Sequence, residues 1–256
     1  MTLRRIAHAE AVKLITAGDA ILDCDLADVR WRELPVPEVR LKGCVLADGD
    51  LADAELGDAS FVDCTFHRCS FASATLSGSV WQRSVLFESD PAAGCRFTNA
   101  DLDGAQFEEC NLSMCSFEGA SLTGLSMKAG KATGADFTDA SFTRRKGKAL
   151  VAAVHFSGVA LDLATFAGLT LDEADFAECS LRQADFSGST LSDAVFRGID
   201  GTEINVSGAT LDKADFREAR LEGVNLAAAK SFRAIKVSQS QLATLANSLG
   251  IRVFPD

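Results

Sequence analysis

The sequence predicts an all-β solenoid built from stacked four-sided coils, and three observations carry this prediction. A large apolar residue recurs every five residues over about residues 21–230, with two shifts of frame. The position two before a centre residue is usually small or apolar: Ala, Cys, Ser, Val, Gly, Leu or Ile. The residue just before a centre is often Asp or Asn, and the residues after it are mixed and polar. A period of five fits neither a helix, at about 3.6 residues per turn, nor a simple strand, at about 2.

The repeat is specific because it is long. The centres run through residues 21–86, 97–142 and 156–226, and 31 of the 39 centres are Leu or Phe. A chain that turns a right angle every five residues points one small and one large side chain inward on each side. Such a unit cannot bury its own apolar face, so the coils must stack. Four sides give a coil of about 20 residues, and the 39 units give about ten coils.

The interior of the predicted stack explains two oddities of composition, 17 Phe without Tyr and 8 Cys. Fourteen Phe are centres, and Phe156, Phe176, Phe196 and Phe216 lie 20 residues apart, so we expect them to form one ladder. Every cysteine lies two before a centre, where a reduced thiol acts as a small apolar spacer. Disulfides or metal ligands are the lesser alternative, because Cβ vectors of stacked neighbours run parallel. The cysteines are Cys24, Cys44, Cys64, Cys69, Cys95, Cys110, Cys115 and Cys179.

Both ends carry helix signals, which divide the chain into residues 1–20, 21–230 and 231–256. His8 to Ala17 reads as a short helix that caps the first coil, with Gly18 as its stop. Near the other end, Ser238 and Gln241 form a capping-box signal. The apolar stripe that follows either caps the last coil or forms a two-fold dimer contact. The residues of this stripe and tail are Leu242, Leu245, Leu249, Ile251, Val253 and Phe254.

Two interruptions separate the three blocks of repeats, at residues 87–94 and 143–154. Each is either a tolerated surface insertion or a contact loop held out by a rigid scaffold. The first carries Glu88 and Asp90, and the second carries Arg144, Arg145, Lys146 and Lys148.

The formal charge is unevenly distributed. The whole chain has 25 basic and 36 acidic residues, net −11, yet residues 41–142 and 156–230 carry −9 and −7, and residues 143–155 carry +4. An acidic body argues against direct nucleic-acid binding. Its carboxylates serve either for solubility or to present negative charge as a DNA duplex presents phosphates. No motif of an enzyme, metal site or cofactor site occurs, so we expect no catalysis and no cofactor.

The localisation prediction is cytoplasmic. No apolar run approaches 18 residues, and the first residues lack the apolar core and cleavage site of a secretory signal, so neither a membrane span nor export is expected. Reduced cysteines agree with a cytoplasmic protein.

The segments GADFTDASF (134–142) and QADFSGSTLSDAVF (183–196) resemble the pentapeptide-repeat family. This resemblance implies a right-handed quadrilateral β-helix. Residues 94–142 and 238–253 further resemble the quinolone-resistance Qnr proteins, which are related to MfpA and AlbG.

The Qnr resemblance implies a homodimeric rod that binds DNA gyrase or topoisomerase IV and protects it from poisons or inhibits it. By analogy, residues 87–94 are the smaller loop and 143–154 the larger, topoisomerase-contacting loop, while the C-terminal helix and tail form the dimer. Two departures stand out: the larger loop is more basic than the family pattern, and residues 1–40, with Pro35 and Pro37, are longer. A general interaction scaffold or effector without a topoisomerase partner is the alternative.

Overall fold

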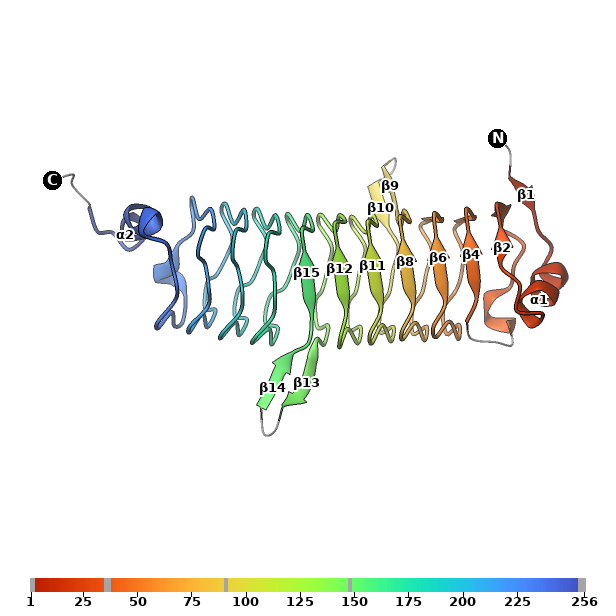
Figure 1. Cartoon of the computed structure of the whole chain (residues 1–256), viewed down its shortest axis with the longest axis horizontal. Coiled ribbons are helices and arrows are strands. Elements are labelled where there is room, and N and C mark those ends of the chain that lie inside the picture. Colours follow the sequence, from red (N-terminus) through yellow and green to blue (C-terminus); the bar gives the residue numbers. More distant parts are fainter. Residues whose placement is uncertain (1–2, 35–37, 90–91, 147–148, 253–256) are drawn as a thin grey trace.

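The computed structural model is a straight rod of stacked coils with the two chain termini at opposite ends (Figure 1). It describes residues 3–34, 38–89, 92–146 and 149–252. Two hairpins leave the rod on opposite sides, while a short helix lies at each end (Figure 1). In the described part of the chain, no helix is long and apolar enough to cross a membrane.

Four parallel ladders run along the rod, one on each face. Face 1 is a seven-stranded sheet in the order β15-β12-β11-β8-β6-β4-β2. Face 2 begins as the four-stranded sheet β1-β3-β5-β7 and continues through single bridges. Faces 3 and 4 consist of single bridges, such as Asp50 with Ser70 and Glu55 with Thr75. The strand bounds are β1 (Arg4–Arg5), β2 (Ile21–Leu22), β3 (Cys24–Asp25), β4 (Arg40–Lys42), β5 (Val45–Ala47), β6 (Ser60–Val62), β7 (Thr65–His67), β8 (Val80–Gln82), β11 (Gln106–Glu108), β12 (Ser126–Lys128) and β15 (His155–Ser157).

The predicted four-sided β-helix is therefore confirmed. The number of regular strands on one face differs from the predicted number of coils. Face 1 has seven strands, fewer than the ten coils expected. Beyond β15 the same face continues only as the bridges His155–Asp175–Val195–Asp215–Lys236. Turn residues there replace the three-residue strands of the earlier coils, so the ladder persists without regular strands.

The interior of the rod holds the centres and the small residues two before them. Phe156, Phe176, Phe196 and Phe216 are fully or almost fully buried and stack at centroid distances of 5.2, 5.2 and 4.8 Å, which confirms the predicted ladder. All eight cysteines are buried and free. Their thiols are spacers, and burial raises the pKa of Cys115 to about 12.

The corners between faces depend on a left-handed residue. The second residue after most centres has positive φ, a conformation that favours Gly, Asn and Asp. It directs the chain into the next side, as when the Ala54 N–H donates to the Leu51 carbonyl at 3.1 Å. The Asp before a centre also bonds locally, since Asp50 accepts the Ala52 N–H at 3.1 Å. That bond confirms the turn role predicted for these aspartates.

The N-terminal end is closed by α1 (His8–Thr16), which packs Ala11 and Ile15 into the core. Strand β1 adds a further rung beside β3. A 3-10 helix, η1 (Trp31–Glu33), interrupts the first coil, and Pro35 and Pro37 lie outside the described residues.

At the C-terminal end, η2 (Leu226–Ala228) and η3 (Gln239–Gln241) lead into α2 (Leu242–Ser248). The predicted capping box is present, with the Ser238 N–H donating to Gln241 Oε1 at 2.5 Å. The Gln241 amide also donates to the Phe216 and Ala219 carbonyls at 2.7 Å each, which ties α2 to the last coils.

The two interruptions, expected as loops, are antiparallel β-hairpins. The first pairs β9 (Phe87–Ser89) with β10 (Ala92–Gly94), and the second pairs β13 (Thr143–Lys146) with β14 (Ala149–Ala152). Neither interrupts face 1, because Trp81 pairs directly with Phe107 and Met127 with Phe156. The hairpins are thus additions to an unbroken rod.

Candidate partner-binding surfaces

Face 4 concentrates the negative charge of the rod. Its ladder runs Glu55–Thr75–Asp101–Ser121–Ser141 and, past the second hairpin, Thr170–Thr190–Thr210–Ser231. Among the described residues of the coils beside this ladder, basic side chains appear only at its C-terminal end, at Lys213, Lys230 and Arg233. We call this surface the acidic face. Its carboxylates belong to Glu38, Glu55, Asp58, Asp101, Asp103, Asp172, Glu173, Asp193 and Asp212.

Several carboxylates of the acidic face are held by the next coil. Asp103 accepts the Ser121 hydroxyl at 2.5 Å and the Thr123 N–H at 2.9 Å. Asp172 accepts the Thr190 hydroxyl at 3.0 Å and the Ser192 N–H at 2.6 Å. These bonds fix the carboxylates on the rod before any partner arrives.

Asp212 repeats the same arrangement at the last coils. It accepts the Ser231 hydroxyl and, at 2.8 Å, the Arg233 N–H. Hydrogen bonds to the charged form, first from Ser231 and then from the Arg233 N–H, lower the pKa of Asp212 below its usual value. The carboxylate therefore stays ionised at neutral pH.

The basic hairpin, β13–β14, leaves the corner between face 4 and face 1. Arg144 and Arg145 are exposed on β13 and pair in register with Val151 and Leu150. Lys146 belongs to the β13 backbone, but its side chain and all of Lys148 lie outside the described residues. The structure thus brings two of the four predicted cations to the edge of the acidic face.

The smaller hairpin, β9–β10, leaves the corner between faces 2 and 3. Its Glu88 forms an ion pair with Arg68, which also donates to the two Asp48 oxygens at 2.7 and 2.8 Å. Glu88 therefore bonds back to the rod, while Asp90 lies outside the described residues. Arg68 lowers the pKa of Asp48 through their hydrogen bond.

The C-terminal end exposes an apolar surface. Leu245 is buried in the chain's own core at 7% exposure, whereas Leu242, Leu249 and Ile251 are exposed. Together with Leu226, Phe232, Ala234, Ile235 and Ala246, these four residues line a hollow of about 380 Å³. Of the predicted dimer residues, Val253 and Phe254 lie outside the described residues.

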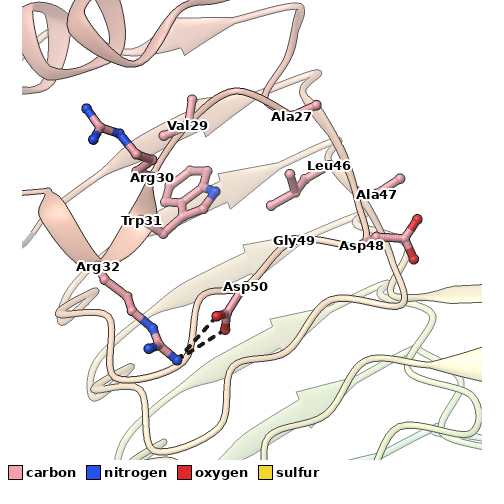
Figure 2. Close-up of a pocket in the computed structure, with 10 residues that line it drawn as sticks. All are labelled: Ala27, Val29, Arg30, Trp31, Arg32, Leu46, Ala47, Asp48, Gly49 and Asp50. Atoms are coloured by element: carbon pink, nitrogen blue, oxygen red, sulfur yellow. Dashed lines mark hydrogen bonds and ion pairs between the residues drawn. The ribbon is translucent and has the colours of Figure 1, made fainter.

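A second hollow, of about 340 Å³, lies beside the divergent first coil (Figure 2). Trp31 forms one wall, and its buried Nε1 has no hydrogen-bond partner in the described structure. At the lower edge of the hollow, the Arg32 guanidinium forms an ion pair with the Asp50 carboxylate at 3.2 Å (Figure 2). The hollow exists because η1 replaces a regular side of the coil. Nothing in its lining combines a nucleophile with an acid or base.

Two residues that the sequence reasoning missed lie on the corner between faces 2 and 3. Met114 and Leu163 are large apolar side chains, 50% and 56% exposed, at left-handed turn positions. The sequence signal was available, because this position otherwise favours polar residues or Gly. The described residues also contain no group of three or more His, Cys, Asp or Glu arranged to hold a metal ion.

Comparison with known proteins identifies the repeat. The family model "Pentapeptide repeat region" matches residues 149–226, and "Pentapeptide repeats (8 copies)" matches residues 39–90 and 93–124. No curated protein sequence matches the chain significantly.

Solved structures share the fold. QnrB1, a plasmid-mediated fluoroquinolone resistance protein, matches with a TM-score of 0.75 at 24% identity, over 81% of this chain and 97% of QnrB1. A trypsin-treated QnrB1 variant matches with a TM-score of 0.66 at 24% identity, over 82% and 99%. HetL, a pentapeptide-repeat protein involved in heterocyst differentiation regulation in the cyanobacterium Nostoc, gives 0.44 at 20% identity, over 91% and 95%. Together, the two family models, which match more than half of the chain, and the four-sided coil place this protein in the pentapeptide-repeat family.

Proposed function

We propose that this protein binds a type II topoisomerase, DNA gyrase or topoisomerase IV, and protects it from poisons such as quinolones or modulates its activity. The observation that carries the proposal is the acidic face with the basic hairpin at its edge. The rod shape shared with QnrB1 supports it at the level of fold. The mechanism is non-covalent, and the protein acts in the cytoplasm.

The acidic face acts as a mimic of a DNA duplex. Its carboxylates engage the basic surface on which a topoisomerase holds DNA, through complementary potentials that speed association and select the partner. Asp103 and Asp172 are already fixed by hydrogen bonds to the next coil, so little side-chain freedom is lost on binding. Because exposed charges are screened by salt, binding weakens as ionic strength rises.

The basic hairpin makes a second contact. Arg144 and Arg145 carry charge opposite to that of the rod, so they reach a different, acidic surface of the same enzyme. In this proposal the rod supplies affinity and the hairpin determines whether a poison is displaced.

The protein is a homodimer joined at its C-terminal ends. Leu242, Leu249 and Ile251 are exposed apolar residues around one hollow, and a second copy would cover them by two-fold symmetry. Leu245 supports this surface from within the core.

A supercoiling assay with purified gyrase and a quinolone tests the proposal. Thr143 pairs with Ala152 at the base of the basic hairpin, so residues 144–151 can be replaced by a two-residue Asn-Gly turn without moving the rod. We expect the unmodified protein to protect gyrase and the shortened protein to keep its melting temperature but lose protection. Full protection by the shortened protein would refute the role of the hairpin. An unmodified protein that neither binds gyrase or topoisomerase IV nor alters their activity would instead be an interaction scaffold for another partner.

A further inference from the structure

One corner of the rod breaks the rule that governs the others. In the described chain, 23 residues other than Gly have positive φ, and most of them are polar. Met114 and Leu163 are the two large apolar residues among them, with φ of 56° and 61°. A bulky side chain in this conformation is unfavourable, and exposing it to water adds a second unfavourable contribution.

Both residues lie on the corner between faces 2 and 3, two coils apart. The Met114 N–H donates to Thr133, next to Gly134, and the Gly134 N–H donates to Asp162, next to Leu163. A Cβ on Gly134 would lie 2.6 Å from Met114 Sδ, so the Met114 side chain extends across the intervening coil toward Leu163. The two side chains thus form one apolar strip along the rod.

The strip is continuous with the smaller hairpin, which leaves the same corner. A Cβ on Gly94 would collide with the backbone of Met114, so β10 runs directly against the start of the strip. Gly94 pairs with Phe87 of β9, a half-buried aromatic residue. Phe87, Met114 and Leu163 therefore follow one another along a single edge.

The charges beside this strip indicate the kind of partner. Face 3 adjoins it on one side; Arg96 is a rung of that ladder near β10, but between Phe97 and Leu226 the described residues beside the ladder include no Lys or Arg. They do include Glu118, Asp136, Asp139 and Asp185. Face 2, on the other side, carries Lys131 and Arg182. An apolar strip with an acidic face along one side is complementary to a protein surface that has apolar pockets beside a basic rim.

We propose that Met114 and Leu163, with the base of the β9–β10 hairpin, form a specificity contact for a basic protein surface. This inference rests on the proposed function and deepens it, because that surface belongs to the topoisomerase. A DNA duplex offers no aliphatic side chains along its backbone, so this contact distinguishes the rod from a simple charge mimic. It also supplies a part of the affinity that salt does not screen.

The test of this contact uses substitutions that suit the positive φ of the two residues. Asn tolerates positive φ better than Met or Leu, so the double variant Met114→Asn, Leu163→Asn removes the strip without straining the fold. Ala129→Asn is the matched control, since Ala129 is an exposed residue with φ of 51° on the corner between faces 1 and 2. Melting temperatures of all three proteins verify that the fold is kept.

Binding of each protein to purified gyrase is measured at low salt and at about 0.5 M KCl, where the screening length falls to about 4 Å. We expect the double variant to bind at least about tenfold more weakly at both salt concentrations, and the control to bind as the unmodified protein does. Equal affinity of the double variant and the unmodified protein would overturn this inference alone. Failure of the unmodified protein to bind gyrase or topoisomerase IV would overturn the proposed function and this inference with it.

Discussion

Replacing Phe176 with Ala tests how the stacked interior stabilises the rod. Phe176 is fully buried, with Phe156 and Phe196 each 5.2 Å away in nearly parallel stacks. Phe166 and Phe186 approach edge-on at 5.6 and 5.4 Å. Truncation of a buried Phe to Ala costs about 3–5 kcal/mol, and each aromatic pair contributes about 0.5–1.5 kcal/mol beyond its buried area. Since four pairs are lost together, we expect a cost near the top of that range, about 5 kcal/mol.

A Phe176→Leu variant separates the volume of the ring from its stacking. Leu41 occupies an equivalent position on the same face, so Leu fits the coil. This variant keeps most of the buried volume and loses the aromatic pairs, for an expected cost of about 1–2 kcal/mol. Urea unfolding with the linear extrapolation method measures both costs.

The location of the lost stability along the rod is a stronger test than the change in the free energy of unfolding. Each coil of a solenoid contacts only its neighbours, so opening should become easier near Phe176 first. Hydrogen exchange should show lost protection around residues 156–196 with little change around residues 41–81. Equal loss along the whole rod, or a cost of less than about 1 kcal/mol for Phe176→Ala, would refute the reasoning.

Three further predictions concern charge, thiols and assembly. Arg83 lowers the pKa of Asp63 through a hydrogen bond. A lowered carboxyl pKa contributes stability that is complete above the pKa of the unfolded state, about 3.9, and is lost as the pH falls through the pKa of the folded state. The melting temperature, measured between pH 7 and 2, should therefore fall below about pH 4, and it should fall less steeply in Asp63→Asn. All eight cysteines are buried, so Ellman's reagent should label none in the native protein and all eight in denaturant, because the reagent cannot reach them in the folded rod. Rapid labelling of the native protein would contradict their packing. Ile251 is 57% exposed, so in the proposed homodimer Ile251→Asp should give a monomer in analytical ultracentrifugation without lowering the melting temperature. A dimer of unchanged mass would place the contact elsewhere, and a monomeric unmodified protein would refute the proposed dimer.

The interior was predictable from the sequence because burial follows the five-residue period directly. Cys115 and Phe176 are assigned to the core by counting alone, and the structure buries both. The turn role of Asp50 was equally accessible, since a short carboxylate before a centre bonds to local backbone.

The form of the interruptions was not predictable, because their pairing is imposed by the rod. The segment TRRKGKALVA has no alternation of apolar and polar residues that would identify two strands. The coil holds Thr143 and Ala152 side by side, and antiparallel pairing then satisfies the backbone between them. Met114 and Leu163 differ from the polar residues and Gly that usually stand at this position of the sequence, but only the observed positive φ shows why a large apolar side chain is unfavourable there.

The distribution of charge between faces depends on register, which composition does not contain. Asp101 and Asp172 share the acidic face only because the β13–β14 hairpin between them bulges out without adding a side to the coil. A single extra five-residue unit between them would leave every side chain buried or exposed as before. It would also rotate all later residues by a quarter turn, and Asp172 and Asp193 would move to face 1. A rod of the same composition and stability would then lack a continuous acidic face, so the proposed recognition depends on the phase of the repeat as much as on its charge.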